Sequence, residues 1–282
     1  MLDINTIREV ESFVSVKPRS VQEIAKHIKK SWRTADRYIQ EIEQEYGTLS
    51  TRTFREGTRG ALKVVYWASI EQMHSSVFQE VLAKQITYLK QKNDFSAFDI
   101  YQHVPSKSRK ATVESVDSED KTDLEELADY IRSTKKQLLI FSGNLSWINL
   151  KNKKSDIFPL IETLAKKNIS IKILSRVDPA AMKNVEKMLA LNFRHGKENV
   201  EIRHTEQPLR ALISDGKLIR IKEIKEPTGR INELNKKTFI FYTIKDKSWV
   251  EWLSKLFWHI FSNSIDARKR VDELKKLRAE GF

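Results

Sequence analysis

The second half of the sequence changes its hydrophobic pattern at short, regular intervals. The strand-like run "KQLLIFSG" precedes the helical stretch "SDIFPLIETLAKKN", and the strand-like "ISIKILS" precedes the helical "PAAMKNVEKMLALNF". Such alternation is typical of a parallel or mixed sheet covered by helices. Asp215-Gly216 lies between two apolar runs and predicts a hairpin, because a tight two-residue turn needs positive φ. We therefore expect an α/β domain over residues 122–282.

The end of the chain predicts one long helix, from residue 247 to about 278, after the last strand "KKTFIFYTI". Most sides of its first half are aromatic, through Trp249, Trp252, Phe257, Trp258 and Phe261. This pattern indicates burial against the sheet, against a second subunit, or against both.

The first 70 residues have a different pattern. Helical periodicity runs from 4 to 46, "KPRS" interrupts it, and Ser20 can cap the second helix. "TLSTRTF" and "ALKVVYWAS" then alternate as strands around the glycine-bounded turn "REGTRG". We expect three helices followed by a β-hairpin.

Two connecting segments separate these units. Residues 71–92 predict a helix with a wide apolar stripe, which either sets the geometry of a dimer or closes the first domain. Residues 93–121 are assigned as a linker segment, because most of it, from residue 104 onward, is polar and poor in large apolar groups and is typical of a linker or a solvated edge.

Length and charge narrow the class of protein. At 282 residues the chain exceeds the usual length of one domain, which favours two compact units. A net charge of +13 favours a polyanionic partner such as nucleic acid or an anionic membrane surface; the alternative is an ordinary soluble protein from a lysine-rich proteome. The lack of cysteine excludes disulfides and thiolate catalysis. With no signal-peptide pattern at "MLDINTIREVESF" and no long apolar run, we expect a cytoplasmic protein without a membrane partner.

The third helix carries the best candidate DNA-binding residues. If Ser31 caps a helix over 32–46, a 100° step per residue places Ala35, Ile39, Ile42 and Tyr46 on one core stripe. The opposite stripe holds Arg33, Arg37, Gln40 and Gln44, side-chain types that bond guanine and adenine edges. The alternative is a solvated face with an Arg37–Glu41 pair.

The hairpin adds positive charge beside this helix. Arg52, Arg55, Arg59 and Lys63 would suit phosphates or a narrow minor groove. Trp32 is expected either to brace the hairpin or to touch a sugar–phosphate. The residues predicted to bind DNA are therefore Ser31, Trp32, Arg33, Arg37, Gln40, Arg52, Arg55, Arg59 and Lys63.

The stretch "VQEIAKHIKKSWRTADRYIQEIE", followed by this hairpin, resembles the helix-turn-helix and wing of winged-helix transcription regulators. Ala25 stands where the two helices would approach closely. The chain departs from the pattern at Lys29, where many family members carry glycine at the turn. The resemblance implies that residues 1–70 bind duplex DNA.

Residues 122–265 resemble the phospholipase-D-like domain that follows winged helices in archaeal regulators of the TrmB family. The resemblance rests on "KQLLIFSGNLSWI", "LIETLAKKNISIKILS", "VEIRH" with "RALISDGKLIRIKE", and "WVEWLSKLFWHIF". Active phospholipase-D enzymes use His-x-Lys-x4-Asp. With Asp215 as the acid, Pro208 stands at the histidine position and Arg210 at the lysine position, and proline cannot attack phosphorus.

We therefore expect no catalytic residues in the C-terminal domain and no cofactor. Family members sense sugars with this domain, which implies an effector pocket near Ser142, Asn144, Arg210 and Asp215, unless Asp215 serves only the hairpin turn. The histidines lack paired metal spacing, so no metal site is expected.

The sequence thus favours a dimeric, sequence-specific DNA-binding transcription regulator. Its expected parts are a winged helix (1–70), a connecting or dimerisation helix (71–92), a linker segment (93–121) and a catalytically degenerate phospholipase-D-like sensor or assembly domain (122–282). One alternative is an architectural chromatin protein that coats DNA with little sequence preference. A nuclease or phosphodiesterase is the other alternative, disfavoured by Pro208.

Overall fold

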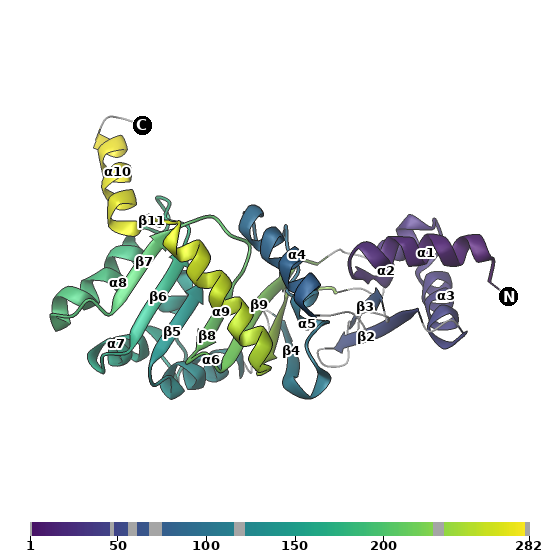
Figure 1. Cartoon of the computed structure of the whole chain (residues 1–282), viewed down its shortest axis with the longest axis horizontal. Helices are drawn as coiled ribbons and strands as arrows, with labels where there is room; N and C mark the ends of the chain where they lie inside the picture. Colours follow the sequence, from purple (N-terminus) through teal and green to yellow (C-terminus); the bar gives the residue numbers. More distant parts are fainter. Residues whose placement is uncertain are drawn as a thin grey trace.

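The computed structural model describes residues 2–45, 48–55, 61–67, 75–115, 122–227 and 234–279. Within these residues the chain forms two parts that lie side by side (Figure 1). The N-terminal part contains helices and a three-stranded sheet, and the larger part is built on an eight-stranded mixed sheet. None of the described helices is long and apolar enough to cross a membrane.

The N-terminal part has the predicted three helices followed by a hairpin, and in addition a short strand, β1 (Arg19–Ser20), that was not predicted. Its elements are α1 (Ile4–Val16), β1, α2 (Val21–His27), α3 (Trp32–Glu45), β2 (Leu49–Arg55) and β3 (Ala61–Trp67). The strands pair antiparallel in the order β1-β3-β2. Val10, Ile24 and Ile39 are fully buried between the helices and the sheet. Ser20 begins α2 as expected, since its hydroxyl accepts from the Glu23 amide and the Glu23 carboxylate accepts from the Ser20 amide.

The turn between α2 and α3 contains the residue at which the sequence departs from glycine. Lys29 adopts φ 53°, a left-handed conformation that costs an L-residue about 1–2 kcal/mol. The Lys30 amide nevertheless donates to Ala25 O at 3.0 Å, which closes the end of α2. The turn therefore forms with lysine, at a local cost in backbone strain.

The segment between the two parts differs from the sequence prediction. Its helix α4 (Ser75–Tyr88) is shorter at its C-terminal end than the expected 71–92, and residues 68–74 lie outside the described residues. Residues 93–121 were expected to be a linker, but they include the helix α5 (Phe98–Tyr101) and the strand β4 (Arg109–Ser115). β4 pairs antiparallel with β10 at one end of the large sheet. β4 is the last strand of the described sheet on that side, and among its described side chains only Lys110 is exposed.

The larger part alternates strands and helices. Its remaining elements are α6 (Thr122–Ser133), β5 (Gln137–Phe141), α7 (Ile157–Lys166), β6 (Ser170–Ser175), α8 (Met182–His195), β7 (Val200–His204), β8 (Ala211–Ser214), β9 (Leu218–Lys225), β10 (Thr238–Ile244), α9 (Lys247–Ser262), β11 (Ile265–Asp266) and α10 (Ala267–Ala279). The described sheet has the order β11-β7-β6-β5-β8-β9-β10-β4. β5, β6 and β7 are parallel, and the other pairings are antiparallel. The mixed sheet agrees with the prediction.

Helices cover both faces of this sheet (Figure 1). One face packs on α4, α5 and α9, where Trp249 and Phe257 are buried. The other face packs on α6, α7 and α8. The aromatic side of α9 is thus largely explained by burial against the sheet within one chain.

The prediction of a single long C-terminal helix was wrong. α9 ends at Ser262, and α10 starts after the short strand β11. The side chains of Ser262, Asn263 and Ser264 each bond a carbonyl four residues earlier, at 2.7–2.8 Å. Such side-chain bonds compete with the helical ladder and explain why the helix stops there.

The two parts share a hydrophobic core. Phe54 of β2 and Val64 of β3 belong to the same buried cluster as residues of α5 and β10. The Phe54 ring lies 5.9 Å from the Phe98 ring and 6.3 Å from the Tyr242 ring, edge to face in both cases. One face of the hairpin is therefore committed to the larger part.

Candidate nucleic-acid interface and ligand pocket

The exposed face of α3 has the predicted composition. Ala35, Ile39 and Ile42 are completely buried, and Arg33, Arg37 and Gln40 are exposed on the other side. Neither arginine has a carboxylate partner among the described residues. The expected alternative pair does not form, since Glu41 accepts from the Leu2 amide at 3.0 Å. Gln44 and Tyr46 cannot be placed, because the side chain of the first and the whole of the second lie outside the described structure.

The start of α3 is held by its own side chains. Ser31 Oγ accepts from the Thr34 amide at 3.2 Å and lies 2.8 Å from Thr34 Oγ1. Trp32 is half-buried and packs against the core of the N-terminal part. Ser31 thus acts as the predicted cap, and the position of Trp32 agrees with a bracing role.

The predicted basic residues of the hairpin have different surroundings. Lys63 Nζ lies 2.6 Å from Asp36 Oδ1, so this lysine ties β3 to α3. The guanidinium of Arg52 lies 5.3 Å from the centre of the Tyr101 ring, at the contact with the larger part. Arg59 lies outside the described residues, as does the side chain of Arg55. Arg52 and Lys63 therefore both have partners within the chain, and their contact with DNA stays a prediction.

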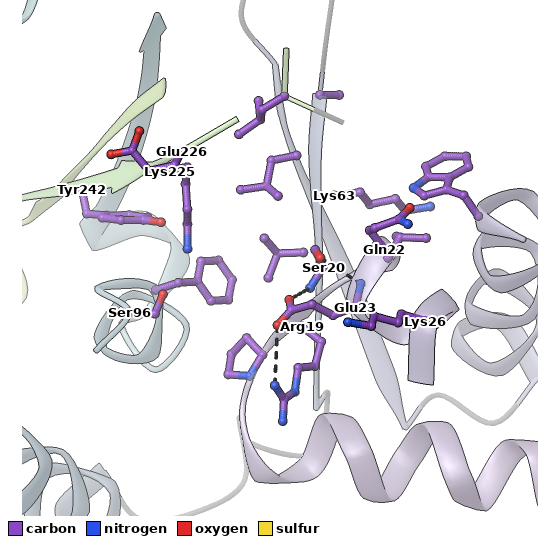
Figure 2. Close-up of a pocket in the computed structure, with 18 residues that line it drawn as sticks. Arg19, Ser20, Gln22, Glu23, Lys26, Lys63, Ser96, Lys225, Glu226 and Tyr242 are labelled. Atoms are coloured by element: carbon purple, nitrogen blue, oxygen red, sulfur yellow. Dashed lines mark hydrogen bonds and ion pairs between the residues drawn. The ribbon is translucent and has the colours of Figure 1, made fainter. Parts of the chain in front are cut away.

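A cleft of about 490 Å³ lies between the two parts, lined by residues of α2 and β3 on one side and of the larger part on the other. Figure 2 shows Arg19, Ser20 and Glu23 on one wall, facing Ser96, Lys225 and Tyr242 on the other. Arg19 and Glu23 form an ion pair of 3.6 Å within the first wall.

The second wall continues into a buried polar cluster. Glu223 accepts from Ser96 Oγ at 2.8 Å and from the Tyr242 hydroxyl at 2.9 Å, and its carboxylate pairs with Lys225 at 2.7 Å. Asp99 lies close enough for burial and the Glu223 charge to raise its pKa from 3.8 to about 7. No sequence pattern considered above predicts this cluster. Its signal is that Glu223 follows Ile219 and Ile221 at a spacing of two, on the inward face of β9.

A second pocket, of about 270 Å³, lies in the larger part. Ser142, Asn144 and Arg210 line it together, as the sequence predicted, along with Trp147 and Phe241. Lys222 and Arg220 line it as well, although Arg220 pairs with Glu126 at 2.6 Å, and the described lining itself contains no carboxylate. The arrangement suits a ligand that carries negative charge and a flat or apolar part.

Arg210 is the central cation of this pocket. Its guanidinium donates to Leu209 O at 2.6 Å and to Gln207 O at 3.3 Å. Burial, and next the charge of Arg176, lower its pKa from 12.5 to about 10, so it stays charged at neutral pH. Gly143 lets the guanidinium lie against the backbone, since a Cβ there would stand 2.8 Å from Arg210 Nη2.

Asp215 does not line this pocket and serves the hairpin turn. Its carboxylate accepts from the amides of Lys135, Lys136 and Gln137 at 2.8–3.0 Å. Burial alone would raise the pKa of Asp215, but these hydrogen bonds and the charge of Lys217 outweigh it and lower the pKa. Asp215 and Gly216 have φ 52° and 63° in a three-residue turn, one residue longer than predicted. The structure therefore separates Asp215 from Ser142, Asn144 and Arg210.

The described residues contain no group of three or more histidine or acidic side chains that could hold a metal ion. They define a two-part chain with an arginine-bearing helix exposed in one part and a cation-lined pocket in the other.

Comparisons with known proteins give only remote likenesses. No family model and no curated protein matches the chain. Among solved structures, a phospholipase D family member, Nuc from Salmonella typhimurium, is 11% identical with a TM-score of 0.40, and covers 56% of this chain and 97% of its own. NucT from Helicobacter pylori is 12% identical with a TM-score of 0.38, and covers 56% and 99%.

A third structure covers nearly the whole chain. TrmBL2, described as an archaeal chromatin protein with a novel mode of DNA binding, is 15% identical with a TM-score of 0.38, and covers 94% of both chains. Identities and TM-scores this low do not assign the chain to a family or to a function.

Proposed function

We propose that the chain is a sequence-specific DNA-binding transcription regulator with a winged-helix N-terminal part. In this proposal α3 enters the major groove, and Arg33, Arg37 and Gln40 contact base edges and phosphates. The observation that carries the proposal is the pair of exposed arginines on α3, which have no carboxylate partner among the described residues. Like charges four residues apart repel by a few tenths of a kcal/mol in a helix, and an anionic partner removes that cost.

Mutation of Arg37 tests this proposal. Arg37→Ala should weaken binding to a selected operator by about 1–3 kcal/mol and relax the preference at one base position. Lys276→Ala on α10 is the control, since it removes an exposed cation that, like Arg37, has no carboxylate partner among the described residues and that lies far from α3. Selection of binding sites from random duplexes, followed by titration at fixed salt, measures both effects. If Arg37→Ala and the unmutated protein bind the operator with equal affinity and equal base preference, Arg37 does not contact the bases.

The larger part is proposed as a catalytically degenerate phospholipase-D-like domain that senses an effector or mediates dimerisation. In this proposal an effector in the pocket of Ser142, Asn144 and Arg210 changes the spacing of two DNA-binding parts through α4, and the operator is pseudo-palindromic. Thermal shifts with a panel of sugars, sugar phosphates and nucleotides test the pocket. Gly143→Ala is the control variant, because its Cβ would displace the Arg210 guanidinium and should abolish any shift.

An architectural chromatin protein that coats DNA with little sequence preference is the second candidate function, favoured by the net charge of +13. Salt dependence is shared by both candidates, but only a regulator keeps a large ratio of specific to non-specific affinity. Catalysis is proposed to be absent, because Pro208 and Arg210 stand where a nucleophilic histidine and a lysine would be needed. Cleavage of DNA or a diester by the purified protein, lost in Asp215→Asn, would reverse that proposal.

A further inference from the structure

Loops from six places in the chain lie along one edge of the large sheet, the edge that is formed by the ends of its strands. β5, β6 and β7 begin there, because Gln137 pairs with Ser170 and Ile171 pairs with Val200 in parallel. The β8–β9 turn lies beside the start of β5, since Leu138 pairs with Ser214. The end of β10 and the start of β4 complete the edge through the pairings of Ile244 with Ile219 and with Arg109.

Every one of these loops carries lysine. From β7 to β4 the residues are Lys197, Lys166, Lys167, Lys135, Lys136, Lys217, Lys245 and Lys107, here called the lysine row. All are exposed except Lys197, which is half-buried. None of them forms an ion pair with a carboxylate in the part of the chain that the structure describes.

Hydrogen bonds fix the loops of the lysine row to one another. The Ser170 amide donates to Lys136 O at 3.1 Å, and Lys197 Nζ donates to Lys166 O at 3.2 Å. The carboxylate of Asp215 holds the amides of Lys135 and Lys136. The backbone that carries the ammonium groups is therefore ordered, and binding through them does not require ordering of the loops.

The acidic side chains on this edge are already occupied. Asp215 accepts from three amides, Asp246 caps α9 through the Trp249 amide, and Glu198 pairs with Arg268 at 2.9 Å. At the opposite edge, by contrast, Lys92 pairs with Glu226 and Arg176 with Asp178. These three carboxylates keep their charge, but the eight lysines outnumber them, so the lysine row is a strip of predominantly positive charge.

Helix dipoles explain the position of only some of the lysines in the lysine row. α6, α7 and α8 end near this edge, and a cation in the last turn of a helix is stabilised by its negative end. This effect applies to Lys166, which lies in the last turn of α7. It falls off within one turn and does not explain lysines in the β8–β9 turn, after β10 or before β4.

The dimensions of the row fit a long polyanion better than a small ligand. Neighbouring strands lie about 4.8 Å apart, so seven strands from β7 to β4 span roughly 29 Å. Duplex DNA carries one charge per about 1.7 Å of its axis, so this length faces many phosphates. The β4 end of the row adjoins the N-terminal part (Figure 1).

We propose that the lysine row is a second DNA-binding surface, which contacts the sugar–phosphate backbone without reading sequence. The choice of duplex DNA as the partner rests on the proposed function of α3. The row adds affinity for any duplex long enough to reach it, and α3 supplies the sequence preference.

The test neutralises four exposed lysines, Lys135→Gln, Lys136→Gln, Lys166→Gln and Lys167→Gln, and leaves Lys197 with its hydrogen bond. The matched control changes four exposed lysines elsewhere that lack ion pairs within the described residues: Lys84→Gln, Lys153→Gln, Lys255→Gln and Lys276→Gln. Circular dichroism and melting curves check that both proteins are folded. Affinity for a long duplex of random sequence is then measured from low to moderate salt.

The row variant should lower the slope of log affinity against log salt by about 3 to 4, since each phosphate contact contributes about 0.9, and the control should lower it far less. Equal slopes for the two variants would overturn the proposal, because only net charge would then matter. If the row variant loses binding to vesicles of phosphatidylserine and phosphatidylcholine while its DNA binding is unchanged, the proposal is also overturned, in favour of a membrane surface. The vesicle measurement is needed because Phe193, near Lys197, is 93% exposed.

A variant with Arg33→Ala and Arg37→Ala separates this proposal from the proposed function. Loss of site preference in that variant, with an unchanged salt slope in the row variant, would leave the function of α3 standing and overturn the row. Retained preference in the α3 variant, with a reduced slope in the row variant, would overturn the function of α3 and support the row as an independent DNA-binding surface.

Discussion

Lys63 and Asp36 form an ion pair in which the ammonium nitrogen lies 2.6 Å from a carboxylate oxygen and each side chain is only 17% exposed. The second oxygen of Asp36 accepts from Gln40 Nε2 at 3.1 Å. One carboxylate therefore fixes the position of β3 against α3 and orients a predicted base-reading side chain. The lysine contributes to the packing of the N-terminal part rather than to its exposed charge.

Removal of either partner of this pair should destabilise the N-terminal part. Lys63→Ala or Asp36→Ala should each cost about 1–2 kcal/mol, because the remaining half-buried charge loses its partner. A double-mutant cycle by denaturant unfolding should give a coupling energy of about 1 kcal/mol. The exposed pair Arg132 and Asp129 is the control and should couple by less than about 0.5 kcal/mol. A coupling for Asp36 and Lys63 no larger than that of the control would contradict the bracing role.

Lys29→Gly should stabilise the turn between α2 and α3. Lys29 has φ 53°, a conformation that glycine adopts without a Cβ penalty. We expect a net gain of about 0.5–1 kcal/mol after the entropy cost of glycine in the unfolded chain, measured by urea unfolding. Lys29→Ala removes the same charge but keeps a Cβ, so it should give no gain. A similar gain in both variants would mean that the charge, and not the backbone, is responsible.

Asp99 should make the protein less stable as pH rises from about 4 to 7. Burial, and then the charge of Glu223, raise the pKa of Asp99 from 3.8 to about 7. In this window the unfolded chain has released the proton and the folded chain retains it, so stability falls with rising pH. Asp99→Asn should remove this fall, by as much as a few kcal/mol, in unfolding curves recorded across the window. Asp272→Asn, at an exposed position, should leave the profile unchanged; a fall that persists in Asp99→Asn would assign it to another group.

His103 should make the protein less stable as pH falls, over a pH range that overlaps the range for Asp99. Burial, and then the charge of Arg109, lower the pKa of His103 from 6.5 to about 4. Between these values the unfolded chain binds a proton that the folded chain excludes, so stability is lost as pH falls from about 6.5 to 4. His103→Phe keeps a ring against Phe78, which stacks at 4.0 Å, and should flatten this part of the profile. The exposed His259→Phe serves as control, and identical profiles for the two variants would exclude His103 as the source.

Local periodicity predicted much of the N-terminal part correctly. A 100° step per residue separates Arg33, Arg37 and Gln40 from the buried Ile39, and the structure agrees. The Ser20 cap depends only on neighbouring residues and formed as predicted. The predicted turn at Asp215 formed with three residues rather than two, and the carboxylate of Asp215 bonds amides 78–80 residues earlier in the chain. The end of α9 had a local signal in "SNS", but the aromatic pattern on both sides made the helix look continuous.

Contacts between residues that are far apart in the sequence could not be predicted from local periodicity. Lys63 meets a carboxylate 27 residues earlier, and Arg52 meets Tyr101 across the contact between the two parts. The residues of β4 have the composition of a linker, yet they complete a sheet through main-chain bonds to β10. Ser142 and Arg210 share a pocket because β5 and β8 are neighbours, whereas Asp215 lies beyond the other end of β8.

The sequence by itself determined the order of most elements, the mixed α/β character of the larger part and the composition of the exposed face of α3. These properties follow from the periodicity of apolar residues and from caps and turns, which act over a few residues. Only the tertiary structure decided which cations are paired and which remain available to a polyanion. Charge pairing depends on distances of a few ångströms between side chains that the fold brings together from remote positions.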